Sequence, residues 1–269
     1  RIDIGEALAT EWLPEVHTAI FASATMTVSK SFEHFNHAVG LDRIGASTSS
    51  SLHLDSSYDF DSNMAVVVAG DIPDPRDRES YLTALDHLAM GGSVLTLFTN
   101  RRDMEDLYAR VEPKMARAGL ELNCQQRNSS PRRLRDRFIN EPTSSLFALK
   151  AFWEGFDASG ETLRCVIIPK LPFSSPTDPL SCERAARDDQ AWRRYVLPQA
   201  VLEVKQAAGR LIRSSTDSGV LILADPRLVT KGYGKKFLTS LPTSSYQRIE
   251  SAQIGHYLQL WRARHERRR

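Results

Sequence analysis

Short runs of aliphatic residues alternate along this chain with longer stretches that are typical of helices. Seven such runs are bounded by polar residues or glycine: Ala19–Ser23, Met64–Ala69, Val94–Phe98, Leu120–Cys124, Ser145–Leu149, Leu163–Ile168 and Gly219–Ala224. This alternation predicts an α/β fold, with helices covering both faces of a mostly parallel sheet. The 269 residues suffice for one large domain, or for one domain with a subdomain.

The stretches between these runs are predicted to be helical. They are Arg76–Met90, Asp103–Ala118, Pro131–Phe138 and, near the end of the chain, Ile249–Arg264. The longer stretch Cys182–Arg213 is predicted to hold two helices broken near Pro198, because proline has no N–H to donate inside a helix. The serine-rich segment Gly45–Asp61 and the proline-containing segment Leu171–Ser181 are expected to be surface loops.

The bulk composition excludes several classes of protein. The net charge of +2 is too small to indicate nucleic-acid binding, so local arginine clusters must carry any such binding. No apolar run approaches the ~18 residues that cross a bilayer, and no signal peptide opens the chain. The three cysteines are far apart and lack metal or disulfide spacing, which favours a cytoplasmic protein without a membrane partner. The first residue is Arg1, so we expect a piece of a longer protein.

The run from Gln206 to Arg213 is a candidate for binding phosphate. Arg210 and Arg213 are three residues apart, a spacing that would place both guanidinium groups on one face of a helix. Guanidinium stays charged and matches phosphate oxygens with paired hydrogen bonds, so two of them suit a polyphosphate. By itself, the run is explained equally well as the basic end of a helix.

Other polar groups directly follow predicted strands, where ligands bind in open α/β sheets. Ser23-Ala24-Thr25 follows the first run and would relay hydrogen bonds to a nucleotide site. Thr99, Asn100 and Arg101 follow the run Val94–Phe98 and open a helix, where N–H groups and polar side chains suit phosphate oxygens. Simple capping of that helix is the alternative explanation.

A third polar group lies between two later strands. Gly155 permits a close approach of the backbone to a ligand, and Asp157 can accept a hydrogen bond from a ribose hydroxyl or orient an arginine. A tight aromatic turn is the alternative reading for this segment.

Taken in order, these runs resemble the motifs of the DinG/XPD helicases of superfamily 2. The matching segments are SAT at 23–25, motif IV at 98–102, FWEG-x-D at 152–157, KLPF at 170–173, QxxGRxxR at 206–213, DPR at 225–227 and YGxxF at 233–237. The resemblance implies a RecA-like fold. It also implies that residues 41–269 form the second motor domain, and that residues 1–40 are a trailing segment of the first.

The resemblance implies roles at an ATP site. Arg210 and Arg213 would act as arginine fingers on the γ-phosphate, and Gln206 would position a finger or the attacking water. The residues implied to meet the nucleotide are Glu154, Gly155, Asp157 and Gly209.

The resemblance also implies contacts with DNA. Thr99, Asn100 and Arg101 would touch single-stranded DNA, along which the family moves from 5′ to 3′. The resemblance also implies a role in DNA repair. Asp225 and Arg227 are expected to support the arginine fingers. The family usually has Gln-Gly where this chain has Gln125-Gln126-Arg127, so a DNA contact there is in doubt.

Two parts of an ATPase are missing from the sequence. It has neither a G-x-x-x-x-G-K-[ST] loop nor a DExx run after a strand. ATP and Mg²⁺ would therefore be held mainly by the first motor domain of the same protein, and the chain alone is expected to be inactive. The four-cysteine iron–sulfur set of many relatives is also absent here, which leaves such a cluster to other parts of a full-length protein.

Two other classes of function are the alternatives. One is a RecA-like module that binds nucleic acid or protein without hydrolysing ATP. Its binding surface would consist of Arg132, Arg133, Arg135 and Arg137. The alternative explanation for this cluster is a solvated helix face. The other is a complete small-molecule enzyme, which the seven histidines do not support because none pairs with a strand-end serine or cysteine. His34 and His37 share a helix face without a further metal ligand.

Overall fold

The computed structural model describes residues 3–45, 48–88, 92–141, 143–149, 152 and 163–266. The chain divides into two compact units. One combines Arg1–Ser56 with Pro172–Lys205 and is called the split unit below. The other combines Ser57–Leu171 with Gln206–Arg269 and is called the sheet unit.

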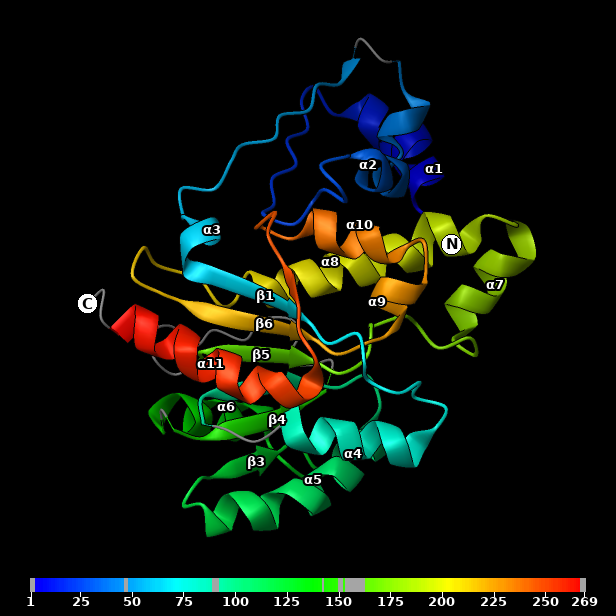
Figure 1. Ribbon diagram of the computed structural model, residues 1–269. Helices are drawn as coiled ribbons and strands as arrows, with labels where there is room; N and C mark the ends of the chain where they lie inside the picture. Colours follow the sequence, from blue (N-terminus) through cyan, green and yellow to red (C-terminus); the bar gives the residue numbers. More distant parts are fainter. Residues whose placement is uncertain are drawn as a thin grey trace. The chain divides into compact units, whose positions relative to one another are not determined.

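The sheet unit is built on seven parallel strands in the order β3-β4-β2-β5-β6-β1-β7 (Figure 1). Their bounds are β1 Met64–Val68, β2 Val94–Leu97, β3 Leu122–Cys124, β4 Ser145–Ala148, β5 Cys165–Ile168, β6 Gly219–Leu223 and β7 Gln247–Arg248. All residues of β1, β2, β5 and β6 are buried, as parallel strands covered on both faces require. The predicted parallel α/β fold is confirmed.

The predicted strand Ala19–Ser23 is wrong. These residues have no regular structure, and Ile20 is 87% exposed. An apolar run forms a parallel strand only where neighbours bury both of its faces, and this run has no such neighbours. Two-residue β7, which pairs with β1, was not predicted because its residues are polar and exposed.

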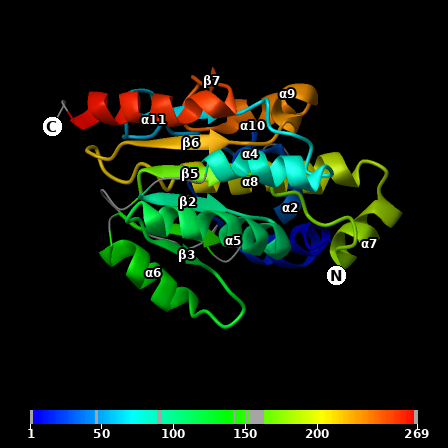
Figure 2. The same cartoon turned by 60° about the horizontal axis from the view of Figure 1, so that its bottom comes forward.

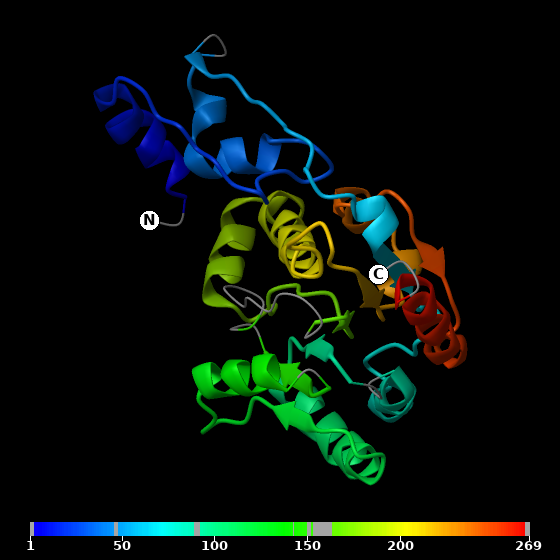
Figure 3. The ribbon, with the colours of Figure 1, turned by 90° about the vertical axis from the view of Figure 1, so that its left-hand side faces the viewer.

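Helices pack on both faces of the sheet. In the sheet unit they are α3 Phe60–Asn63, α4 Arg78–Leu88, α5 Arg101–Arg117, α6 Pro131–Asn140, α9 Arg227–Thr230, α10 Gly234–Ser240 and α11 Ser251–Glu266. One core cluster joins the sheet to buried residues of α4, α5 and α11, among them Leu82, Leu107 and Ile254. Figures 2 and 3 show these three helices on one side of the strands, and Figure 3 shows α6 on the other. The four helices predicted in this unit are confirmed, with ends shifted by a few residues.

The split unit consists of short helical elements from two distant parts of the chain. They are α1 Gly5–Ala7, η1 Leu8–Trp12, η2 Leu13–Glu15, α2 Glu33–Val39, η3 Leu41–Arg43, α7 Pro179–Arg187, η7 Trp192–Val196 and the first nine residues of α8 Leu197–Ala208. Gly40 follows α2 with a φ of 78°, and a Cβ there would lie 2.0 Å from the Gly5 carbonyl oxygen. Glycine is therefore required for the close approach of α1 and α2.

The predicted break near Pro198 is wrong. The first helix ends at Asp188, whose extended backbone and side chain form a turn: its carboxylate accepts from the Gln190 N–H at 2.8 Å and from Arg194 at 2.6 Å. Pro198 lies in the first turn of α8, directly after the π-helical turn η7. This π-helical turn carries wider hydrogen bonds, such as that from the Leu197 N–H to the Trp192 carbonyl oxygen, and such a bulge accommodates a residue without an N–H inside a continuing helix.

No helix among the described residues combines the length and the apolar character needed to cross a bilayer.

Candidate functional site

The arginine pair lies after a helix instead of on one. Helix α8 ends at Ala208, and Gly209 and Arg210 form a turn in which the Arg210 and Leu211 N–H groups donate to the carbonyls of Ala207 and Ala208 at 3.3 and 3.1 Å. The prediction that Arg210 and Arg213 share a helix face is therefore wrong. The helix stops at Gly209, the residue type that most often follows a helix end, and beyond it Leu211 and Ile212, each 2% exposed, both enter the core.

Asp217 fixes the backbone at the second arginine. The residue is 6% exposed, and its carboxylate accepts hydrogen bonds from the N–H groups of Arg213 and Ser214 at 2.8 and 2.9 Å. Gly219, the first residue of β6, makes room for the side chain between the two arginines: a Cβ there would lie 2.8 Å from Leu211 Cδ2. Arg210 is itself only 8% exposed. The loop that carries the arginines is thus held in one conformation.

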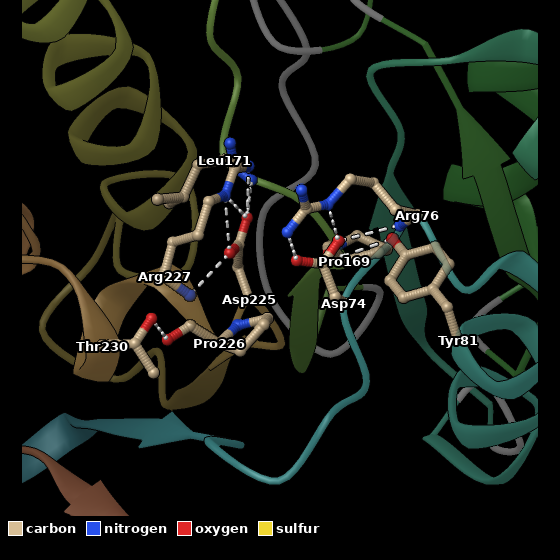
Figure 4. A network of polar contacts seen from close by, with 9 residues as sticks. All are labelled: Asp74, Arg76, Tyr81, Pro169, Leu171, Asp225, Pro226, Arg227 and Thr230. Atoms are coloured by element: carbon tan, nitrogen blue, oxygen red, sulfur yellow. Dashed lines mark hydrogen bonds and ion pairs between the residues drawn. The ribbon is translucent and has the colours of Figure 1, made fainter.

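A buried carboxylate organises the carboxyl ends of β5 and β6 (Figure 4). Asp225, which is fully buried, follows β6 and accepts from the Leu171 N–H at 2.8 Å, beyond the end of β5. It also accepts from the Arg227 N–H at 2.9 Å and from the Arg227 guanidinium, whose Nη2 lies 2.6 Å from Oδ2. Asp225 therefore joins the KLPF segment to the DPR segment. A role of Asp225 or Arg227 toward the arginine fingers stays a prediction.

Two further contacts lie in the same view (Figure 4). The Tyr81 hydroxyl of α4 donates to the Pro169 carbonyl oxygen at 3.2 Å, and burial raises the pKa of Tyr81 above its ordinary range. In the loop after β1, Asp74 pairs with the exposed Arg76 at 2.8 Å, and the hydrogen bonds from Arg76 hold the pKa of Asp74 well below its usual value. The strand ends of β1, β5 and β6 thus carry ordered, charged loops, as a ligand-binding edge requires.

The proposed DNA contacts lie at the start of α5. Thr99 and Asn100 are exposed, and the Asn100 side chain accepts from the N–H groups of Arg102 and Asp103 at 2.8 and 3.4 Å. Asn100 is therefore the N-cap of a 17-residue helix. Arg101 donates to the Gln125 carbonyl oxygen at 2.9 Å, which ties this helix start to the loop after β3. Capping and a DNA contact are compatible, so the DNA contact stays a prediction.

The SAT segment contributes a contact that the sequence did not reveal. Ser23 and Thr25 are linked by a 3.2 Å bond from the Thr25 N–H to Ser23 Oγ. Two residues on, Thr27 is buried and accepts at both its carbonyl and its hydroxyl from Lys205 of α8, each at 3.1 Å. Lys205 was missed because no spacing or local pattern connects it to a residue 178 positions away. Asp217 was missed although it is close in the chain, because it lies beyond the QxxGRxxR motif and binds the backbone.

Some predicted site residues lie outside the described residues. They are Glu154, Gly155 and Asp157, together with most of the motif that contains them. Among the described residues, no group of three or more His, Cys, Asp or Glu side chains is placed to hold a metal ion.

Cys124 and Cys165 are buried, and burial raises the pKa of each thiol to about 12.

A family model that describes the helicase C-terminal domain matches residues 85–244, which is more than half of the chain. The chain belongs to this family, in its DinG/XPD-like form. The matched stretch of this helicase domain contains Thr99–Arg101, Gln206–Arg213 and Asp225. The SAT segment precedes it.

Known relatives of this helicase domain are longer than the chain. The Bacillus subtilis (strain 168) protein named 3'-5' exonuclease DinG is 30% identical over 270 residues, which cover 96% of this chain and 29% of the relative. The Escherichia coli (strain K12) ATP-dependent DNA helicase YoaA is 35% identical over 232 residues, covering 83% of this chain and 35% of the relative. The chain spans about a third of the length of these curated relatives.

A solved structure shows the same fold. Xpd4 of S. tokodaii superposes with a TM-score of 0.51 at 14% identity, covering 77% of this chain and 42% of Xpd4. The RecA-like parallel sheet of this helicase domain is thus confirmed.

Proposed function

We propose that the chain is the second motor domain of a longer ATP-dependent DNA helicase, and that Arg210 and Arg213 act on the phosphates of ATP. The observation that carries the proposal is the position of QxxGRxxR: it lies inside the stretch that matches the helicase C-terminal domain, on a loop fixed by Asp217. Relatives named as ATP-dependent DNA helicases support the reaction class.

The residues of this loop fit a triphosphate. Two guanidinium groups on one loop, three residues apart in the sequence, supply fixed positive charge and forked donors, which match phosphate oxygens. In related NTPases an arginine finger is worth about 10³–10⁵ in rate. Gln206 would position a finger or the attacking water. Gly209, with Glu154, Gly155 and Asp157, would face the nucleotide, while ATP and Mg²⁺ would be held mainly by the first motor domain of the same protein.

Single-stranded DNA would bind at the start of α5. The free positive end of a helix and the side chains of Thr99, Asn100 and Arg101 offer donors to phosphate oxygens. Asn100 already satisfies two of the first N–H groups, so its contact with DNA would use its amide nitrogen. Movement from 5′ to 3′, a role in DNA repair and a cytoplasmic location belong to this proposal.

The domain organisation is part of the same proposal. Residues 1–40 would be the trailing segment of the first motor domain, and residues 41–269 the second motor domain. The phosphate-binding loop, and an iron–sulfur cluster where the protein has one, would lie in the rest of the full-length protein. The chain alone should then hydrolyse no ATP; turnover by the isolated chain would show that it holds a complete site.

The test is Arg210→Ala in the full-length protein. We expect DNA-stimulated ATP hydrolysis to fall by about 10³-fold or more, while the ATP dissociation constant changes by only a few-fold, because a finger acts mainly in the transition state. The matched control is Arg248→Ala, which removes an exposed arginine from the edge strand β7. Hydrolysis near the wild-type rate in Arg210→Ala would remove Arg210 from the proposed role.

One observation favours the alternative of a non-hydrolysing binding module. Arg132 and Arg133 of α6 are exposed, and the Arg132–Asp136 contact is long, at 4.0 Å. Binding of single-stranded DNA to the chain, measured against salt concentration, separates the two functions. A steep salt slope that is lost in Arg132→Ala/Arg133→Ala would favour the module, since each phosphate contact adds to the slope.

A further inference from the structure

Lys205 makes an unusual contact for a lysine. It lies in α8 directly before Gln206, and its ammonium donates to the carbonyl oxygen and to Oγ1 of Thr27, both at 3.1 Å. Thr27 is 4% exposed and lies 178 positions earlier in the chain. Both residues belong to the split unit.

The chemistry of this contact is costly to maintain. The ammonium is partly buried, and burial lowers the pKa of Lys205. Its two acceptors are neutral, and among the described residues no carboxylate lies within ion-pair distance of it. A partly buried charge without a counter-ion loses hydration that neutral oxygens restore only in part. An apolar side chain of the same length would pack at this position with less cost, so packing alone does not explain the lysine.

The two ends of the contact lie beside two motifs. Thr27 comes two residues after Ser23-Ala24-Thr25, and Lys205 is followed at once by Gln206 of QxxGRxxR. Helix α8 is continuous from Leu197 to Ala208, so the position of Lys205 is rigidly tied to the last turn before the arginine loop. A force on that loop therefore reaches Thr27 through one turn of helix and two hydrogen bonds.

We propose that Lys205 is a positioning residue that ties the segment after SAT to the helix that presents Gln206 and the arginines, so that both shift together when ATP is bound and hydrolysed. The inference rests on the proposed function. Lys205 touches neither ATP nor DNA in this role. Its loss should therefore uncouple hydrolysis from strand separation and leave ATP binding largely intact.

The test uses five variants of the full-length protein, one of which is the double variant Lys205→Met/Thr27→Val. Lys205→Met keeps the length and the apolar stem but removes the charge, and Lys205→Arg restores a charged donor. Thr27→Val removes Oγ1 and keeps the carbonyl acceptor. Lys236→Met, at an exposed lysine of α10, is the matched control for loss of a charge. For each we would measure DNA-stimulated kcat, KM for ATP, base pairs unwound per ATP hydrolysed, and Tm.

Lys205→Met should lower the base pairs unwound per ATP by about tenfold, a typical size for the coupling between two sites. KM for ATP should stay near the wild-type value, while Tm should fall, because the contact also holds the split unit together. Thr27→Val should lower the same ratio two- to threefold and add nothing in the Lys205→Met background, because both changes break one contact. Lys205→Arg should recover part of the ratio, and Lys236→Met should leave it unchanged.

An unchanged ratio in Lys205→Met, with or without a lower Tm, would overturn the inference, because a merely structural lysine alters stability alone. If Lys205→Met does not fold, additive effects of Thr27→Val and Lys205→Arg on the ratio would overturn it equally. Failure of the proposed function looks different: the wild-type protein would lack DNA-stimulated hydrolysis, or Arg210→Ala would retain it.

Discussion

The two compact units are held together in different ways. In the sheet unit, one core joins six fully buried strands to three helices. In the split unit, segments more than a hundred residues apart are joined by polar contacts: Lys205 with Thr27, His34 with the Arg194 carbonyl, and His37 with the Tyr195 hydroxyl. The large apolar core belongs to the sheet unit, while the described contacts between distant segments of the split unit include these hydrogen bonds.

The split unit is also less completely filled. A hollow of 1030 Å³ lies within it, lined in part by Thr27, Phe35 and Leu52. Phe21 bridges Trp12 and Phe35, with ring centroids 6.5 and 5.4 Å apart, yet it remains 37% exposed. Regions with few buried apolar contacts open at lower free energy than packed cores. We therefore expect protonation and single polar substitutions to lower the free energy of local opening first in the split unit. The sheet unit should be destabilised mainly by changes in its core.

The largest effect on stability is expected from Asp225→Ala in the sheet unit. The change leaves the Leu171 N–H and the Arg227 guanidinium without their buried acceptor, and breaking a buried pair costs about 3–5 kcal/mol. Urea unfolding followed by circular dichroism would measure the loss. The control is Asp74→Ala, which breaks the solvent-exposed pair with Arg76 and should shift the midpoint far less. Equal shifts in the two variants would show that the Asp225 network does not stabilise the strand ends.

Gly234→Ala should have the next largest effect. A Cβ at the start of α10 would lie 2.0 Å from the Leu228 carbonyl oxygen, so the backbone of α9 or α10 must move. Overpacking of this kind costs about 1–3 kcal/mol, and more where the backbone resists. Gly255→Ala is the matched control: nothing lies near its Cβ, and alanine favours the helix α11 by up to about 1 kcal/mol. Thermal unfolding should show opposite shifts, and a lower Tm in both variants would contradict the assignment of the cost to this clash.

The same contrast explains how much the sequence could predict. Six of the seven predicted strands are present, because a parallel strand that is buried on both faces has a nearly continuous aliphatic sequence. The run Ala19–Ser23 has the same composition but no partner strand, and partners are not visible in local sequence. The split unit as a whole escaped prediction because its contacts join residues such as Thr27 and Lys205 across the chain.

The candidate site shows the same limit. The residue types of QxxGRxxR pointed to the arginine pair, whose role stays a prediction. Its local structure depends on Leu211 and Ile212 entering the core and on Asp217 binding the backbone at Arg213. Asp217 is only four residues beyond Arg213, but it binds backbone N–H groups of a bent loop, and a helical spacing rule considers side-chain pairs on a helix and not such loops. The sequence also pointed to Asp225, but its bond to the Leu171 N–H depends on β5 and β6 being neighbours, which no local pattern shows.

The smallest expected effect is a dependence of the split unit on pH through His34. Its Nδ1–H donates to the Arg194 carbonyl oxygen at 3.1 Å, and burial lowers its pKa below the ordinary 6.5, with His37 and Arg184 nearby opposing a further positive charge. His37 itself contacts Asp42 and the Tyr195 hydroxyl, and the Arg184 guanidinium lies over the Tyr195 ring. The folded state therefore favours neutral His34.

The sign of the effect follows from this lowered pKa. As the pH falls below 6.5, the unfolded state binds a proton at His34 before the folded state does, so the free energy of opening falls until the lowered pKa is passed. Hydrogen exchange of the α2 amides, corrected for the intrinsic rate at each pH, should show weaker protection at pH ~5.5 than at pH ~7.5. His34→Gln keeps an N–H donor but does not titrate, so it should remove most of this difference while β1 and β6 remain protected at both values. The same pH dependence in His34→Gln would assign it to another group, with His37 the next to test.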